Sequence, residues 1–230
     1  MREKSLYAIG VAGFGILIWF LYRILFQIPD EVEQGAIYRI IFYHVPSSFT
    51  ASLCYFSAML ASVGYLVKRD NRFDSYAVSA TEVGLAFAAI NLITGMIWGR
   101  IIWGIWWAWD ARLTWALITW LVYFGYLVLR KAIDDPTERA KISGVLSIFS
   151  FVSVMITFKA IVWWRTQHPG PVLSIRNSDG VQRMDPAMET MMYQNWIPLL
   201  MIAFVFVMIR WRQEETQREI EAVRRFAHAR

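Results

Sequence analysis

The sequence predicts an all-α membrane protein with six transmembrane helices. Of its 230 residues, 57% are hydrophobic and only 18% are charged, a balance that is not typical of a water-soluble domain of this length. The apolar residues gather in six segments, each close to the roughly 20 residues that cross about 30 Å of hydrocarbon. We place these segments at residues 6–28, 45–67, 76–98, 115–130, 142–163 and 194–211.

The first, fourth and last segments need separate interpretation. The first follows Met1-Arg-Glu-Lys4, but it is too long for a secretion signal and lacks a small-residue cleavage site, so we expect an uncleaved helix. The fourth is the shortest, and its outer end can be continuous with the tryptophan-containing residues that precede it. After the sixth, the chain is polar, and the pairs Glu214–Arg218 and Glu221–Arg225 are spaced four residues apart. This spacing favours a helix that continues beyond the membrane, either as a solvated end or as a docking surface.

Basic residues outside these segments fall mostly on one side of the membrane. Fifteen Lys and Arg residues flank the segment ends on the side that holds both termini, and six lie on the other side. The positive-inside rule therefore predicts that both termini are cytoplasmic. We expect one membrane domain over residues 1–230, with outer loops at about 98–114 and 164–193 and a cytoplasmic tail at about 212–230.

The first of these outer loops contains an unusually dense run of tryptophans, Trp103-Gly-Ile-Trp-Trp-Ala-Trp-Asp-Ala-Arg-Leu-Thr114. Trp favours the membrane–water interface, where its ring is buried and its N–H stays hydrated. An ordinary aromatic belt is the alternative, although a belt would scatter these residues over the helix ends. So dense an aromatic shelf indicates a flat apolar ligand with charged edges, such as haem. The candidate ligand-binding residues are Trp103, Trp106, Trp107, Trp109, Asp110 and Arg112.

Two of the three histidines are predicted to lie on the same side as this shelf. His44 is at the outer mouth of the second segment, His168 follows the fifth, and His228 is in the tail. Imidazole is a standard axial ligand of haem iron, so His44 and His168 together can complete a six-coordinate site. Neither has the companions of a zinc site, and no nucleophile accompanies them for acid–base catalysis. We therefore take both as candidate iron ligands.

The propionates of haem need cationic partners, for which the guanidinium group is well shaped. Arg112 is the best candidate because it lies in the Trp-rich stretch. Asp110 is expected to orient Arg112 or an indole N–H, since its carboxylate would repel a propionate. Weaker candidates for the propionates are Arg39, Arg100, Lys159 and Arg165.

Other classes of protein fit less well. A transporter commonly has polar or interrupted spans at the midplane, whereas these spans offer little beyond Asn91, Thr94, Thr119 and Thr157. An electron-transfer cytochrome b would hold its histidine pairs inside the helices. A purely structural subunit would leave the Trp-rich stretch unexplained. The single cysteine, Cys54, excludes an intramolecular disulfide and a covalent CxxCH haem site.

The Trp-rich stretch resembles the signature of the tryptophan-rich (WWD) family of haem-handling membrane proteins. Two further stretches, Tyr38-Arg-Ile-Ile-Phe-Tyr-His-Val-Pro-Ser47 and Asp185-Pro-Ala-Met188, resemble signatures of the branch of that family that serves cytochrome c maturation. The resemblance covers nearly the whole chain. The ending Asp110-Ala-Arg-Leu-Thr114 differs from that of the larger haem lyases of the CcmF and CcsA types.

The resemblance implies a bacterial inner-membrane protein that holds haem b non-covalently at its periplasmic face. The axial ligands of the family match His44 and His168. The resemblance also implies presentation of haem to the haem chaperone CcmE, and association with the ABC transporter subunits CcmA and CcmB and the small membrane protein CcmD. It favours a delivery protein over an enzyme. A haem-conducting subunit of an ABC complex and a haem lyase-like component are the alternatives.

Overall fold

The computed structural model describes residues 3–170 and 184–228. Six of its helices are long and apolar enough to cross a membrane. Apart from an isolated bridge between Glu31 and Gly35, the described residues form no β-structure. The predicted all-α class with six spanning segments is thus confirmed. The helices, with one short 3-10 helix, are α1 (Glu3–Phe26), η1 (Ala36–Ile40), α2 (Ile41–Lys68), α3 (Asn71–Ile102), α4 (Ala111–Ala132), α5 (Pro136–Trp163) and α6 (Pro186–His228).

The helices are longer than the apolar segments that predict them, which corrects two loop boundaries. Helix α3 continues to Ile102 and α4 starts at Ala111, so only residues 103–110 of the expected 98–114 loop are non-helical. The loop expected over 164–193 was wrong from Pro186 onward, where α6 begins, and its residues 171–183 lie outside the described residues. Hydropathy marks the membrane-crossing part of a helix, whereas the backbone hydrogen bonds continue through polar residues beyond it.

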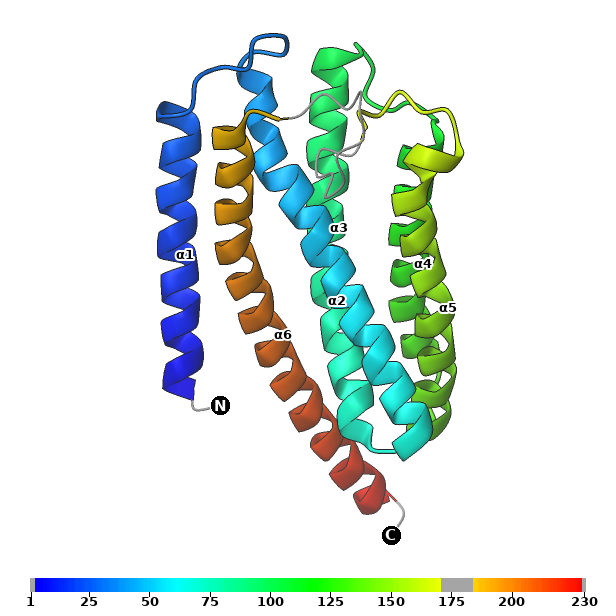
Figure 1. Ribbon diagram of the computed structural model, residues 1–230. Helices are drawn as coiled ribbons and strands as arrows, with labels where there is room; N and C mark the ends of the chain where they lie inside the picture. The colour runs from blue at the N-terminus through cyan, green and yellow to red at the C-terminus, as the bar shows by residue number, and fades with distance from the viewer. Residues whose placement is uncertain (1–2, 171–183, 229–230) are drawn as a thin grey trace.

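The six helices form a bundle in which neighbours in sequence pair closely. Helix α2 packs on α3 and α4 packs on α5, while α1 lies beside α6. Helix α2 also contacts α5 and α6, so it lies at the centre of the bundle. In Figure 1 both chain ends are at the lower end of the bundle, and the 103–110 segment and the α1–α2 connection are at the upper end.

Aspartate caps fix where three of the helices start. The side chain of Asp70 accepts a hydrogen bond from the amide of Arg72 at 2.9 Å, at the start of α3. Asp110 accepts from the Leu113 amide at 2.9 Å at the start of α4, and Asp135 plays the same part for α5. Each cap satisfies an amide that has no partner inside its helix.

Close packing at the centre of the bundle depends on a glycine. A Cβ atom at Gly84 of α3 would lie 2.9 Å from Cε1 of Tyr55 on α2, so only glycine lets the Tyr55 ring fit against this helix. The ring of Tyr55 in turn stacks on that of Tyr123 from α4, with 3.6 Å between centroids and 6° between planes. Small residues allow membrane helices to approach this closely.

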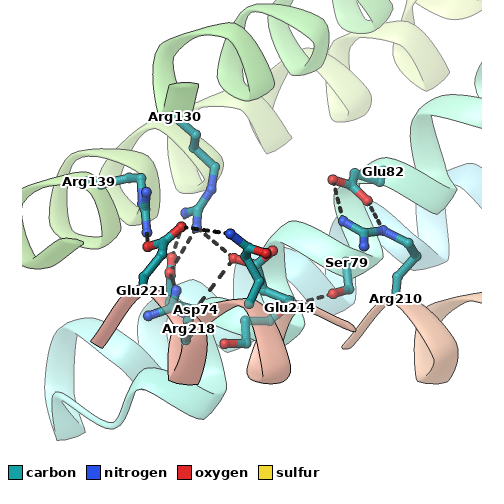
Figure 2. Close-up of polar contacts among 11 residues, drawn as sticks. Asp74, Ser79, Glu82, Arg130, Arg139, Arg210, Glu214, Arg218 and Glu221 are labelled. Atoms are coloured by element: carbon teal, nitrogen blue, oxygen red, sulfur yellow. Dashed lines mark hydrogen bonds and ion pairs between the residues drawn. The ribbon is translucent and has the colours of Figure 1, made fainter. Parts of the chain in front are cut away.

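A buried ion cluster joins three helices at the lower end (Figure 2). The guanidinium group of Arg130 on α4 donates to both carboxylate oxygens of Asp74 on α3, at 2.7 and 3.0 Å. Arg218 of α6 also binds Asp74, and Glu214 of α6 lies 3.8 Å from Arg130. The side chains of Asp74 and Arg130 are only 2% and 6% exposed. The two acidic and two basic groups balance one another's charge.

The polar end of α6 is docked against the bundle by further pairs. Arg139 of α5 donates to Glu221 at 3.2 Å. Arg225 donates to the backbone carbonyl of Asp134 at 2.9 Å. The predicted continuation of the sixth helix is confirmed, and its contacts are those of a docked segment.

Of the two ion pairs expected within the tail, only one forms. The side chains of Glu214 and Arg218 approach to 3.9 Å. Glu221 and Arg225 each find a partner in another part of the bundle. Contacts with other parts of the bundle thus replace the ion pair that the spacing of four residues predicts.

Candidate haem-binding site

A cavity of about 980 Å³ lies at the upper end of the bundle. Pockets for small molecules usually measure about 300–1,000 Å³, so this one is large enough for a sizeable ligand. Its walls come from the α1–α2 connection, α2, α3, α4 and the chain on both sides of residues 171–183. Five of the predicted site residues line it, namely His44, Trp103, Trp107, Arg112 and His168. Trp106, Trp109 and Asp110 are not among the lining residues.

The His44 imidazole is held in one tautomer by α3. Its Nδ1 lies 3.0 Å from the Thr94 hydroxyl oxygen. That hydroxyl donates its own proton to the Ile90 carbonyl at 2.7 Å, so it can only accept a hydrogen bond from Nδ1. The proton is therefore on Nδ1 and the lone pair is on Nε2, which is the atom that can bind a metal ion.

Asn91, one turn before Gly95 on α3, braces the same histidine. Its amide nitrogen donates to the His44 backbone carbonyl at 3.0 Å and lies 3.2 Å from Nε2 and 3.3 Å from Nδ1 of the ring. The helix backbone and the ring of His44 are thus tied to one point of α3. Binding of a metal ion at Nε2 requires the Asn91 amide to move away from that atom.

Gly95 permits the close approach of the His44 ring. A Cβ atom at this position would lie 3.0 Å from Cε1 of His44. We expect Gly95→Ala to displace the ring and weaken haem binding about tenfold, because overpacking costs about 1–3 kcal/mol and 1.4 kcal/mol is a tenfold change in affinity. A haem titration followed by absorbance measures this change.

Gly125→Ala on α4 is the matched control, because a Cβ atom at Gly125 meets no atom within 4 Å. Both substitutions place the same residue in the middle of a helix. Equal affinities in the two variants would show that the position of the His44 ring does not limit haem binding.

His168 is held by a short turn after α5. Its Nδ1 lies 2.8 Å from the carbonyl oxygen of Pro169, to which it donates, so the lone pair of this imidazole is on Nε2. The backbone amide of His168 donates to the hydroxyl of Thr166 at 3.0 Å. Burial lowers the pKa of His168, and the positive charge of Arg112 lowers it further. The imidazole is therefore neutral at pH 7, as a metal ligand must be.

Asp110 connects this turn to the Trp-rich segment. One of its carboxylate oxygens caps α4, and the other accepts hydrogen bonds from the Thr166 hydroxyl and from the Gln167 amide at 3.0 Å. Burial on its own would raise the pKa of Asp110, but the hydrogen bonds from Leu113, Thr166 and Gln167 outweigh it and lower the pKa. Asp110 thus stays ionised, and its contacts are those of a residue that positions the His168 turn.

Arg112 is fixed by two contacts on α5 and also borders the cavity. Its guanidinium group donates to the backbone carbonyl of Thr157 and lies over the ring of Phe158, 5.3 Å from the centroid. The guanidinium group carries five N–H donors in a rigid plane. The donors that remain can bind a carboxylate in the cavity.

The tryptophans do not form one flat shelf. Trp103 packs edge-on against Trp98, and Trp107 against Trp109, with planes at 79° and 76°, because the ring edge is attracted to the face of a neighbouring ring. Trp98, Trp103 and Trp107 line the cavity. Trp109 does not line it and is 77% exposed.

Trp106 is likewise 57% exposed. Within the cavity wall, the Trp107 indole N–H is buried and has no hydrogen-bond partner among the described residues. Buried donors are normally paired. This N–H is therefore a candidate donor to an acidic ligand.

Sequence reasoning missed an acidic part of the cavity wall. Asp30, Glu31 and Glu33 of the α1–α2 connection line it. Gln34 of the same connection accepts a hydrogen bond from the Trp98 indole at 2.8 Å. The cluster of acidic residues just after Pro29 is the sequence feature from which this part of the wall could have been predicted. Its negative charge would repel propionates, which leaves the Arg112 side of the cavity for them.

Comparison with known proteins assigns the chain to a family. The family model described as CcmC, heme exporter protein C, matches residues 1–225. A heme exporter protein C of Bradyrhizobium diazoefficiens is 36% identical over 182 residues, which cover 79% of this chain and 65% of that relative, slightly less than two thirds of its length.

Two further relatives have the same name. The heme exporter protein C of Paracoccus denitrificans is 33% identical over 199 residues, with 86% of this chain and 81% of the relative covered. That of Escherichia coli K12 is 32% identical over 184 residues, with 80% and 73% covered. With a family model matched over almost its entire length, the chain belongs to the heme exporter protein C (CcmC) family.

Proposed function

We propose that this protein holds haem b non-covalently in the upper cavity, with His44 and His168 as axial ligands, and presents it to the haem chaperone CcmE during cytochrome c maturation. The observation that carries the proposal is that both histidines border one cavity and that both carry the proton on Nδ1, which puts the iron-binding lone pair of each ring on Nε2. Two neutral imidazoles are a standard ligand set for six-coordinate haem iron.

The other polar groups of the cavity suit the same cargo. Arg112 offers cationic donors to a propionate, and the Trp107 indole adds a further N–H. Trp98 and Trp103 supply apolar surface for the porphyrin. Binding by two imidazoles without a covalent bond also allows release, because the loss of either one opens the iron to a new ligand.

We place the cavity on the periplasmic side of a bacterial inner membrane. The support is the excess of Lys and Arg at the opposite end of the bundle, where both termini lie. The name of the relatives, heme exporter protein C, supports assembly with further subunits. We propose CcmA, CcmB and CcmD for that role, with this chain as a delivery protein and not an enzyme.

A haem-conducting path through the bundle has less support. Beneath the upper cavity, between Asn91 and Tyr55, lies a void of about 40 Å³. This volume is far below that of the upper cavity and of ligand pockets in general. The bundle thus favours a site that is loaded and emptied from its upper end.

The visible absorption spectrum of the haem-loaded protein tests the proposal. Wild type should give the spectrum of low-spin, six-coordinate haem, because two imidazoles supply a strong ligand field. His44→Ala and His168→Ala should each give high-spin haem or lose it. His228→Ala is the control and should leave the spectrum unchanged. A low-spin spectrum that survives in both single variants would overturn the assignment of the ligands.

A further inference from the structure

One face of α4 is polar along most of the depth of the bundle. Thr119, Tyr123, Tyr126 and Arg130 follow one another at steps of three or four residues and so lie on one side of the helix. All four are buried, with Tyr123 and Tyr126 fully enclosed. Burying polar groups inside a membrane protein costs free energy unless they are hydrogen-bonded. We therefore expect each polar side chain on this face to have a hydrogen-bond partner.

Three tyrosine hydroxyl groups on or next to this face have no hydrogen-bond partner among the described residues. They belong to Tyr126 and to Tyr55 of α2 and Tyr123 of α4, the last two of which stack their rings. Tyr55 is 2% exposed and Tyr123 is fully buried. Buried hydroxyls are rarely unpaired, and an internal water molecule is the usual partner where no protein group is in reach.

Tyr55 borders a small cavity that can supply such water. The cavity measures about 40 Å³ and lies beneath the large one, with which it shares Asn91, Leu92 and Ala116. One water molecule needs about 10–15 Å³ of such space, so about three or four fit. The polar residues that line it are Ser48, Ser52, Tyr55, Asn91, Thr119 and Thr157.

The lower end of the same face is closed by paired charges. Arg130 binds Asp74 through two hydrogen bonds, and both side chains are buried (Figure 2). The small cavity instead adjoins the upper cavity through Asn91. Water in it would therefore exchange with the upper end of the bundle.

We propose that the small cavity is a binding site for ordered water, held by the Tyr55 hydroxyl, the Thr119–Thr157 hydroxyl pair and Asn91, and that this water supports His44 from within the membrane. Thr119 and Thr157 are already joined at 3.0 Å, which leaves lone pairs for a water donor. Asn91 touches both sites, because its amide nitrogen binds the His44 carbonyl and lies against the His44 ring. Water that holds the Asn91 amide in position thereby also holds the His44 ring in position. The support of His44 by water rests on the proposed function, whereas the water site itself does not.

The first test is hydroxyl-radical labelling of the intact protein in lipid nanodiscs, without haem. Radicals formed from bound water modify the buried side chains that touch it. Tyr55 should be labelled although it is 2% exposed, whereas Phe87, 5% exposed in the apolar core, should not. Absence of labelling at Tyr55 would overturn the water site whatever the protein does with haem.

The second test compares Tyr55→Phe with Tyr123→Phe, two equally conservative changes within one ring stack. Only Tyr55 lines the small cavity. Tyr55→Phe should release ferric haem to an excess of apomyoglobin about three- to tenfold faster than wild type, the effect of one hydrogen bond, and its low-spin fraction should fall. Tyr123→Phe should match wild type in both readouts.

The outcomes separate the water site from the proposed function. Labelling of Tyr55 with equal release rates in the two variants would overturn the support of His44 and leave the water site in place. Labelling in a wild type that takes up no haem would contradict the proposed function alone. Faster release from both variants to the same extent would assign the effect to the ring stack and overturn the role of the water.

Discussion

Asp74→Ala is expected to destabilise the protein by about 3–5 kcal/mol, the largest single effect that the structure predicts on folding. The change removes the carboxylate that binds Arg130 and Arg218, and Arg130 is 6% exposed. The charge of Arg130 would stay buried, with Glu214, 3.8 Å away, as its remaining acidic partner among the described residues. Unfolding of the detergent-solubilised protein by SDS, followed by circular dichroism, measures the loss.

Glu82→Ala is the matched control for Asp74→Ala. Glu82 also binds an arginine of α6, Arg210, but the two side chains are 31% and 34% exposed. A partly exposed ion pair contributes less to stability than a fully buried one, so we expect a smaller loss here. Equal destabilisation by the two substitutions would contradict the conclusion that burial makes the Asp74 cluster critical.

Arg112→Ala is expected to weaken haem binding about ten- to a hundredfold. Hydrogen bonds to charged groups contribute about 1.5–3 kcal/mol, and each 1.4 kcal/mol is a factor of ten in affinity. In the proposed complex, Arg112 donates such bonds to a propionate from the cavity wall. A haem titration at pH 7 measures the change.

Arg100→Ala is the control for this substitution. Arg100 lies near the same end of the bundle, but it is exposed, donates to the carbonyl of Gly104 and does not line the cavity. Its loss should leave haem affinity within about twofold of wild type, the scale of an ordinary surface substitution. An equal loss of affinity in both variants would indicate general electrostatic attraction of haem and not a site at Arg112.

Arg112→Ala should also shift the pH dependence of haem binding. Burial and then the charge of Arg112 lower the pKa of His168, so in wild type this ligand is protonated only below the ordinary histidine range, near 6.5. Removing Arg112 raises that pKa, and low-spin haem should be lost at a higher pH as the solution is acidified. An unchanged acid transition would show that Arg112 does not act on His168.

The sequence predicts the number and order of the helices because each span needs a run of apolar residues. It does not predict that α3 continues to Ile102 or that α6 begins at Pro186, since both helices extend beyond the apolar run that marks their span. The ion pair between Arg130 and Asp74 illustrates this limit. The two residues are far apart in sequence, and only the packing of α4 on α3 brings them together.

The candidate site shows a similar division. His44 and His168 are predicted to meet because topology places both at one end of the bundle, and they do border one cavity. The contacts of His44 with Asn91, Thr94 and Gly95 are not predictable in the same way, because they depend on the rotation and height of α3 against α2. Trp103 and Trp107 line the cavity, whereas Trp106 and Trp109 are exposed. This difference also depends on the packing of the chain and is not visible in the sequence.

Pulsed EPR of ferric, haem-loaded protein that contains ¹⁵N-labelled histidine is the most direct test of bis-histidine ligation. The chain has three histidines, and porphyrin nitrogens remain ¹⁴N, so strongly coupled ¹⁵N nuclei count the axial imidazoles. We expect two in wild type and in His228→Ala, and at most one in His44→Ala and in His168→Ala. One or no coupled ¹⁵N nucleus in wild type would contradict the proposal that His44 and His168 hold haem between them.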